Sequence, residues 1–314
     1  MPPILEVHDL VKAYGDTLAV KGLRFSIAEG EIFGLLGPNG AGKTTTLSML
    51  STLFPPTSGD AIIGGFSVVK QADQVRRLIG VVPQEIALYE DLSVRENLAF
   101  WGQMYGLTGR ELHQRVDAAL GQTGLQEKAT HRVRTLSGGM KRRLNIGVGL
   151  LHRPRLLFMD EPTVGIDPQS RRAILDTVKE LNRQGMTILY TTHYMEEAQE
   201  LAHRVGIIDH GELIALGTQA ELVRQVGEQQ TLRLQFEEDQ SVAALAEKFA
   251  CLPGVARVKA EDHSLALLGE SAERMLPPAV QLCGEVGLRL RTVQIQEPNL
   301  EALFLHLTGR ALRD

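Results

Sequence analysis

Short apolar runs bounded by turn residues fill most of the first two thirds of the chain. Runs such as LLFMD (156–160) and TILYTT (187–192) are nearly continuous rather than alternating, a pattern typical of parallel strands that are covered on both faces. The segment GKTTTLSMLSTLF (42–54) reads as a helix that stops before two prolines. The pattern therefore predicts an α/β unit built around a buried, largely parallel sheet.

Two changes of pattern divide the chain further. Between residues 88 and 135 the spacing becomes helical, and Ser93 with Glu96 forms a capping-box signature. The polar stretch VGEQQ (226–230) has no periodicity, so we expect domains at residues 1–226 and 230–314, with a helical subdomain at about 88–135. The second domain reads β-α-β-β-α-β-α, which predicts a small ferredoxin-like α+β fold, with Pro277 and Pro278 interrupting its second helix.

Composition narrows the class of protein. The chain has 314 residues, of which 43% are hydrophobic and 23% charged, as expected for a soluble globular protein. A net charge of −5 provides no basic footprint, so no nucleic acid is expected as a partner. The start MPPILEVHDL does not resemble a signal peptide, and apolar runs such as IGVGLL (146–151) are far shorter than the ~20 residues of a spanning helix. Any work at a membrane should therefore pass through a partner.

A glycine-rich segment, GPNGAGKT, fits the phosphate-loop pattern G-x-x-x-x-G-K-[ST] at every fixed position and lies between a strand and a helix. Its backbone N–H groups and the helix N-terminus would hold phosphate oxygens. Lys43 would lie between the β- and γ-phosphates, and the Thr44 hydroxyl would bind Mg²⁺. The predicted nucleotide-binding residues of this segment are Gly37, Pro38, Asn39, Gly40, Ala41, Gly42, Lys43, Thr44 and Thr45.

Polar residues follow three predicted strands. Asp160 and Glu161 end the strand LLFMD, at the edge where such sheets bind ligands. Asp160 would bind Mg²⁺, directly or through water, and Glu161 would accept a proton from the attacking water or merely cap the following turn. His193, after the next strand, would touch the γ-phosphate or position Glu161 and the water, although a lone histidine is more often structural. Gln84, in VVPQE, could reach Mg²⁺ or the water but is uninformative by itself.

Six motifs in this order, the phosphate loop, VVPQE, LSGGM, LLFMDEP, VGID and TTH, resemble the ATP-binding subunit of an ABC transporter. The resemblance spans about Ile4 to Gly217. It implies an α/β P-loop NTPase with a mixed sheet core and a helical subdomain, using ATP and Mg²⁺. It also implies that two copies pack head to tail around two ATP molecules, that the helical arm contacts membrane subunits, and that residues 84–89 form its hinge and docking edge.

In that family the Ser-Gly-Gly turn contacts the ATP held by the partner subunit, which assigns this role to Ser137, Gly138, Gly139 and Met140. The local chemistry agrees. Ser137 would offer a hydroxyl, backbone N–H groups and the positive end of a helix, and the glycines would permit close approach. The alternative is an N-capped helix without a ligand. Met140 stands where the family commonly has Gln, which puts the local hydrogen bonding in question.

Three more roles come from the same resemblance. Tyr14 would stack on the adenine, Val20 would abut the base, and Asp167 would signal across the dimer to the opposite site. A tyrosine near a strand end is otherwise more often a packing residue. Val164 and Ile166 replace the common Ser and Leu of the loop ending at Asp167.

The last 20 residues, IQEPNLEALFLHLTGRALRD, and the domain before them resemble daunorubicin exporter ATPases and their accessory domain. The resemblance implies a homodimeric ATPase on the cytoplasmic face of a bacterial or archaeal inner membrane, driving a separate permease that exports a drug, lipid or glycan. The rival interpretation is a soluble ABC ATPase acting mechanically on nucleic acid or ribosomes. Such proteins carry coiled-coil insertions or two ATPase modules, and this sequence has neither.

Two further side-chain groups have plainer interpretations. The basic run Lys141-Arg142-Arg143 is expected to be a solvated helix face rather than a phosphate site. Phe100 and Trp101 are expected to pack within the helical arm rather than contact a ligand.

Overall fold

The computed structural model describes residues 3–225, 230–237, 242, 245–261, 263–296 and 300–308. The chain divides into two compact units, Met1–Thr218 and Gln219–Ala311. The expected boundary segment VGEQQ lies outside the described residues except for Gln230, and residues 297–299 and 309–314 of the tail also lie outside them.

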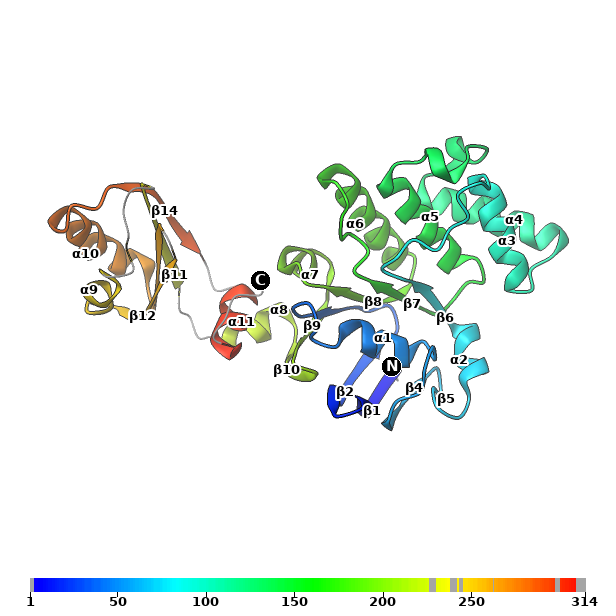
Figure 1. Cartoon of the computed structure of the whole chain (residues 1–314), viewed down its shortest axis with the longest axis horizontal. Coiled ribbons are helices and arrows are strands. Elements are labelled where there is room, and N and C mark those ends of the chain that lie inside the picture. Colours follow the sequence, from blue (N-terminus) through cyan, green and yellow to red (C-terminus); the bar gives the residue numbers. More distant parts are fainter. Residues whose placement is uncertain are drawn as a thin grey trace. The chain divides into compact units, whose positions relative to one another are not determined.

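A six-stranded mixed sheet forms the centre of the larger unit (Figure 1). Strands β9, β3, β8, β7 and β6 are parallel, and β10 pairs with β9 as an antiparallel edge. Every residue of β3, β7 and β8 is buried, so the buried, largely parallel sheet predicted from the apolar runs is confirmed, and the antiparallel β10 makes it the mixed sheet that the family resemblance implies. In sheet order the strands are β10 (Glu212–Gly217), β9 (Arg204–Asp209), β3 (Ile32–Leu36), β8 (Thr187–Thr192), β7 (Leu156–Asp160) and β6 (Ile79–Val82).

Both faces of this sheet are covered. On one face, α1 (Lys43–Leu50) lies between the central sheet and a second, antiparallel sheet (Figure 1), and their apolar side chains form one cluster with α2 (Ala72–Leu78). The opposite face packs against α5 (Gly138–Leu150), α6 (Pro168–Arg183) and α7 (Met195–Leu201). The second sheet has the order β2 (Thr17–Ala28), β1 (Pro3–Tyr14), β4 (Ser58–Ile63) and β5 (Phe66–Ser67).

The helical arm consists of α3 (Val94–Met104) and α4 (Gly109–Thr123), followed by 3₁₀ turns at Gln126–Lys128 and Val133–Thr135. The predicted capping box begins α3: Glu96 N donates to Ser93 Oγ at 3.2 Å, and Ser93 N donates to Glu96 Oε2 at 2.8 Å. Helix α5 belongs to two cores, because Leu144 packs within the arm and Ile146 packs on the central sheet. The arm is therefore joined to the sheet through α5.

The smaller unit has a four-stranded antiparallel sheet in the order β12-β13-β11-β14. With α9 after β11 and α10 after β13, this is the ferredoxin-like arrangement that the element order predicted. Helices α8 and α11 pack against each other in the same unit. The elements are α8 (Gln219–Gln225), β11 (Gln230–Phe236), α9 (Ala246–Ala250), β12 (Val255–Glu261), β13 (Ser264–Gly269), α10 (Ala272–Glu285), β14 (Leu290–Gln296) and α11 (Leu300–Thr308).

The expected interruption at Pro277 and Pro278 is wrong, because α10 continues through both residues. A proline inside a helix frees the carbonyl of the fourth residue before it. Here those residues are Glu273 and Arg274, which are both exposed rather than packed in the core.

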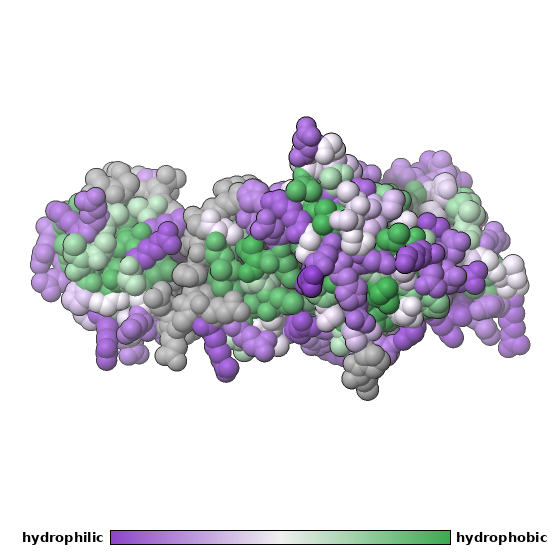
Figure 2. Space-filling view, turned by 90° about the horizontal axis from the view of Figure 1, so that it is seen from below, coloured by the Kyte–Doolittle hydropathy of each residue, from purple (hydrophilic) through white to green (hydrophobic). Residues whose placement is uncertain are grey.

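Hydrophilic side chains dominate the face of the larger unit seen in Figure 2, with apolar patches between them. Among the residues that the structure describes, no helix combines the length and hydrophobicity needed to cross a membrane.

Candidate functional site

The phosphate loop joins the buried strand β3 to α1, and its own packing explains its glycines. Gly40 and Gly42 have φ angles of 78° and 106°, which favour glycine. A Cβ atom on Gly37 would lie 2.2 Å from the Ile208 carbonyl oxygen, and one on Gly42 would lie 2.7 Å from the Ala19 carbonyl oxygen. Neighbouring backbone therefore leaves no room for a side chain at Gly37 or Gly42, so only glycine fits at both ends of the loop.

Lys43 begins α1, and its ammonium group is buried within this loop. Nζ donates to the carbonyl oxygens of Gly37 and Pro38 at 2.7 and 2.9 Å. It also lies 2.9 Å from Glu161 Oε1, and the two side chains are only 3% and 6% exposed. The structure thus brings together two predicted catalytic residues from segments more than a hundred positions apart in the chain.

Glu161 is held by a second partner and by an unusual backbone conformation. His193 Nδ1 lies 3.0 Å from Glu161 Oε2. Because a carboxylate only accepts, Nδ1 carries the proton and donates. Glu161 has a φ of 42°, a left-handed conformation that costs about 1–3 kcal/mol for a non-glycine residue. Its N–H donates to Thr191 Oγ1 at 3.0 Å. Strain of this kind, held in place by hydrogen bonds, is typical of a functional turn.

Asp160 lies beside Thr44, as expected for two ligands of one metal ion. Thr191 Oγ1 donates to Asp160 Oδ1 at 2.7 Å. Burial raises the pKa of Asp160, while Thr191 and the nearby Thr44 side chain act in the opposite direction. A hydroxyl close to a carboxylate provides the oxygen donors that Mg²⁺ prefers, so these residues fit the ion.

Gln84 lies two residues beyond β6, with an exposed side chain. Arg142 of α5 donates to the backbone carbonyl oxygens of Pro83 and Gln84, at 2.7 and 2.5 Å. Arg142 is only 3% exposed. Within the described residues, the Gln84 side chain has no hydrogen bond to Thr44 or Asp160, so its role at the metal remains a prediction.

The expectation of a solvated basic face at residues 141–143 is wrong for Arg142, which is buried, whereas Lys141 and Arg143 are half-buried. Lys141 Nζ lies 2.6 Å from Glu90 Oε1, and Arg143 donates to the Thr123 carbonyl oxygen at 3.0 Å. Burial lowers the pKa of both arginines of the run. The periodicity of one helix could not reveal that α5 lies between the arm and the sheet, where each cation meets an oxygen from a different segment.

The Ser-Gly-Gly turn begins α5, and Ser137 Oγ accepts from Met140 N at 3.3 Å. Ser137 and Gly138 are exposed, whereas Gly139 is buried. A Cβ atom on Gly139 would lie 2.2 Å from Cβ of Ser170 in α6, so this glycine is required by packing within its own chain. The Met140 side chain packs against the apolar core of the arm, which accounts for an apolar residue at this position.

The remaining predicted site residues are more scattered. Asp167 caps the N-terminus of α6, and its carboxylate accepts from Ser170 N at 2.9 Å, which lowers the pKa of Asp167. The Tyr14 side chain is 51% exposed and meets Phe54 edge to face. Val20 is fully buried and belongs to the core beneath the loop. The nucleotide contacts of Tyr14 and Val20 and the signalling role of Asp167 remain predictions.

Sequence reasoning missed the buried polar residues behind the site. Thr191 contacts both Asp160 and Glu161, and Glu197 of α7 is a carboxylate only 2% exposed. The available signal was an acidic residue four positions after His193, on a helix that must cover a buried sheet. Such a residue cannot face the sheet without polar partners.

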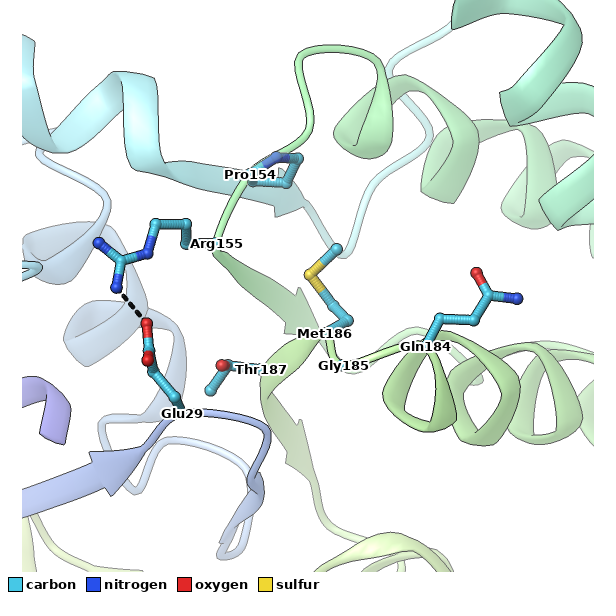
Figure 3. Close-up of a pocket in the computed structure, with 7 residues that line it drawn as sticks. All are labelled: Glu29, Pro154, Arg155, Gln184, Gly185, Met186 and Thr187. Atoms are coloured by element: carbon cyan, nitrogen blue, oxygen red, sulfur yellow. Dashed lines mark hydrogen bonds and ion pairs between the residues drawn. The ribbon is translucent and has the colours of Figure 1, made fainter. Parts of the chain in front are cut away.

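A separate pocket opens at the other end of the central sheet (Figure 3). Its lining includes Arg155 and Thr187, just before β7 and at the start of β8, and Arg155 forms an ion pair with Glu29. The Lys43–Glu161 contact lies at the carboxyl ends of the same strands. The pocket is therefore distinct from the candidate site.

Comparison with known proteins shows several similarities. Residues 20–164 match the family model described as ABC transporter. The chain is 49% identical over 317 residues to the linearmycin resistance ATP-binding protein LnrL of Bacillus subtilis (strain 168), covering 99% of this chain and all of that protein. It is 39% identical to the daunorubicin resistance ATP-binding protein DrrA3 of Streptomyces coeruleorubidus, covering 97% and 96%. It is 38% identical to a Nod factor export ATP-binding protein of Rhizobium sp. (strain N33), covering 98% of each.

Solved structures agree over the larger unit. An ATP-binding subunit of an ABC transporter superposes with a TM-score of 0.64 at 31% identity, covering 71% of this chain and 93% of that one. A dimeric ATP-binding cassette in a post-hydrolysis state, bound to ADP and Pi, gives a TM-score of 0.62 at 28% identity, covering 68% and 98%.

Proposed function

The chain belongs to the family of ABC transporter ATP-binding proteins, and from this premise we propose that two copies of it enclose two ATP molecules and drive a membrane permease. The observation that carries the proposal is the buried contact of Lys43, Glu161 and His193 at the phosphate loop. Together these residues provide a cation for phosphate, a proton acceptor and a group that orients the acceptor.

The proposed reaction is ATP hydrolysis, in which Lys43 changes its counter-ion and Glu161 accepts a proton. The ammonium of Lys43 is paired with Glu161, and the γ-phosphate of ATP would replace that carboxylate as its counter-ion. Glu161 would then be free to accept a proton from water. His193 would keep the carboxylate oriented toward the attacking water through its Nδ1–H. Phosphoryl transfer needs little beyond such positioning and charge stabilisation.

Thr44 and Asp160 would hold Mg²⁺, with Gln84 as a further ligand. When bound, the ion would neutralise charge on the phosphate oxygens. Within the chain, Thr191 orients Asp160 by donating to Oδ1.

The Ser-Gly-Gly turn at residues 137–139, called the signature turn below, supports a head-to-tail dimer. Ser137 and Gly138 are exposed at the N-terminus of a 13-residue helix, and helix N-termini bind phosphate. Among the described residues, no hydrogen bond or ion pair joins Ser137 to the Lys43–Glu161 contact. We therefore assign this turn, with Asp167 beside it, to the ATP held by a second copy, whose adenine would meet Tyr14 near Val20.

An apolar surface near the hinge residues 84–89 supports contact with a permease. Tyr89 meets Phe100 at 4.7 Å between ring centroids, and Phe100 meets Trp101 at 5.6 Å. Tyr89 is 48% exposed and Ile86 is 38% exposed, and contiguous exposed apolar groups mark interaction sites. Trp101 also packs against the arm, as expected from the sequence.

The names of the relatives support an exporter rather than a soluble mechanical ATPase. They refer to resistance to linearmycin or daunorubicin, or to export of Nod factors. We propose that the cargo is a drug-like, lipid or glycan compound, that it passes through the permease, and that this chain works at the cytoplasmic face of the inner membrane. A six-helix hydrophobic protein that co-purifies with the chain would support the permease assignment.

Complementation between two inactive variants tests the shared site. Lys43→Ala removes the phosphate cation, and Ser137→Arg blocks the signature turn. Each variant alone should hydrolyse no ATP, and an equimolar mixture should recover roughly a quarter of the wild-type sites, because a mixed head-to-tail dimer holds one intact site. The control mixture, Lys43→Ala with Glu161→Gln, has no intact site and should stay inactive. Failure of the first mixture to recover activity would refute the sandwich.

A further inference from the structure

Glu197 is a buried carboxylate behind the site that takes no part in the proposed chemistry. It lies on α7 and is 2% exposed. Three hydroxyl groups donate to it. Thr163 Oγ1 lies 2.6 Å from Oε1, and Tyr190 OH and Thr192 Oγ1 lie 2.9 and 3.0 Å from Oε2. Both carboxylate oxygens are therefore occupied by donors from two different segments of the chain.

Two of these donors lie beside the reacting side chains in the sequence. Thr163 follows Glu161 by two residues, and Thr192 immediately precedes His193. Thr192 Oγ1 also accepts from Tyr194 N at 2.9 Å. This hydrogen bond spans His193, which lies between the two residues. One carboxylate thus connects the turn after β7 to the carboxyl end of β8.

The third donor and a nearby cation complete the surroundings of Glu197. Burial and the Glu197 carboxylate raise the pKa of Tyr190 well above its ordinary value, so the tyrosine stays protonated and donates. Arg171 Nε in α6 lies 3.7 Å from Glu197 Oε1, and its guanidinium stacks on the Tyr194 ring at 4.5 Å. A carboxylate suits this position because both of its terminal atoms accept, whereas a glutamine amide would place a donating NH₂ group against one of these hydroxyl donors.

We propose that Glu197 is a positioning residue for ATP hydrolysis, which holds Glu161 and His193 in register by fixing the turns at Thr163 and Thr192. This inference rests on the proposed function, because it assigns a task in ATP hydrolysis to a residue outside the group of Lys43, Glu161 and His193.

The geometry separates this role from nucleotide binding. The Lys43 hydrogen bonds to the Gly37 and Pro38 carbonyl oxygens involve no atom of Glu197, so ATP should still bind when the Glu197 contacts are lost. The turnover step depends on the placement of Glu161, and a displacement of about 1 Å at a reacting group can lower a rate by about a hundredfold. Loss of the Glu197 contacts should therefore lower kcat and leave KM unchanged.

A matched pair of variants tests the inference. Thr163→Val and Tyr190→Phe each remove one hydroxyl that donates to Glu197 and leave the side-chain shape nearly unchanged. Only Thr163 lies on the turn that carries Glu161, whereas Tyr190 is in the middle of β8. Thr163→Val should lower kcat roughly tenfold at constant KM, within the range known for misplaced groups. Tyr190→Phe also removes a hydroxyl that donates to Glu197, but this hydroxyl does not lie on the turn of Glu161. This variant should therefore leave kcat within about twofold of wild type. Thr163→Ser should restore kcat by returning the hydroxyl.

The outcomes separate the two proposals. If the wild type is active and both variants lower kcat equally, or if Thr163→Val raises KM instead, the positioning role is refuted and the proposed function stands. If the wild type hydrolyses no ATP, both fall. Glu197→Gln provides a second measurement: it should lower kcat at least as far as Thr163→Val, and wild-type turnover in this variant would overturn the inference.

Discussion

Replacing Glu161 with Gln should have opposite effects on the free protein and on its complex with ATP. In the free protein, Glu161 Oε1 lies 2.9 Å from the buried Lys43 ammonium. Gln keeps the shape and an acceptor oxygen but removes the charge. The ammonium then retains only the Gly37 and Pro38 carbonyl oxygens and the new amide oxygen as partners.

The magnitude follows from the burial of both groups. Unit charges 2.9 Å apart attract by roughly 6 kcal/mol at an effective dielectric constant of about 20. Desolvation offsets part of this attraction, and removal of one partner from a buried pair typically costs about 3–5 kcal/mol. Because three neutral acceptors remain around Lys43, we expect the lower end, a loss of about 3 kcal/mol in the free energy of unfolding.

ATP should recover that loss, because its phosphate becomes the counter-ion of Lys43 and no longer has to displace a carboxylate. A gain of about 3 kcal/mol corresponds to roughly hundredfold tighter binding. Turnover should fall about 10²- to 10⁴-fold, the usual contribution of a general base. The assays are denaturant unfolding without nucleotide, calorimetric titration with a non-hydrolysable ATP analogue, and phosphate release.

Glu29→Gln serves as the control, since it removes a carboxylate from an ion pair with Arg155 at the opposite end of the sheet (Figure 3). It should change neither analogue affinity nor turnover. If Glu161→Gln binds the analogue no more tightly than wild type and is equally stable without it, the resting pair of Lys43 and Glu161 does not govern nucleotide entry. Near-normal turnover would show that Glu161 is not the proton acceptor.

Two further predictions concern packing. Gly139→Ala places a methyl group 2.2 Å from Cβ of Ser170 and should lower the free energy of unfolding by about 1–3 kcal/mol. Adding Ser170→Gly should restore much of this free energy in denaturant titrations. If the double variant is no more stable than Gly139→Ala, the contact is refuted. Burial raises the pKa of Cys283 to about 11, so a thiol reagent at mildly alkaline pH should label exposed Cys251 and spare Cys283 until denaturant is added, whereas equal labelling rates would contradict this. Because the unfolded thiol has a pKa of about 8.5, the unfolded chain loses that proton first, and the free energy of unfolding should fall as the pH rises from about 9 to 11.

Much of the site could be predicted from sequence because its motifs are local. The phosphate loop is one continuous segment whose backbone is set by Gly40 and Gly42, and the carboxyl ends of neighbouring parallel strands meet at one edge, which brings Glu161 and His193 together. The ferredoxin-like order of the smaller unit was equally readable, because it depends on the succession of short elements.

The two sequence-based predictions that were wrong, for Arg142 and for the prolines of α10, failed for the same physical reason. Arg142 has the sequence context of a solvated residue, and it is buried because α5 is shared between the arm and the sheet. The prolines of α10 carry a strong local penalty, and the helix tolerates them because the freed carbonyls belong to exposed residues. In both cases the burial or exposure of the residue in the folded chain decided its structure. The pattern of a single segment does not contain that information.

The sequence by itself determined the element types, the phosphate loop and the family, since each depends on residues a few positions apart. Only the tertiary structure decided which partner each buried charge meets: Lys43 with Glu161, Arg142 with the Pro83 and Gln84 carbonyls, and Glu197 with three hydroxyls. The physical reason is that a buried charge must find compensating groups wherever the packed chain supplies them, and packing brings together segments that the linear sequence keeps far apart.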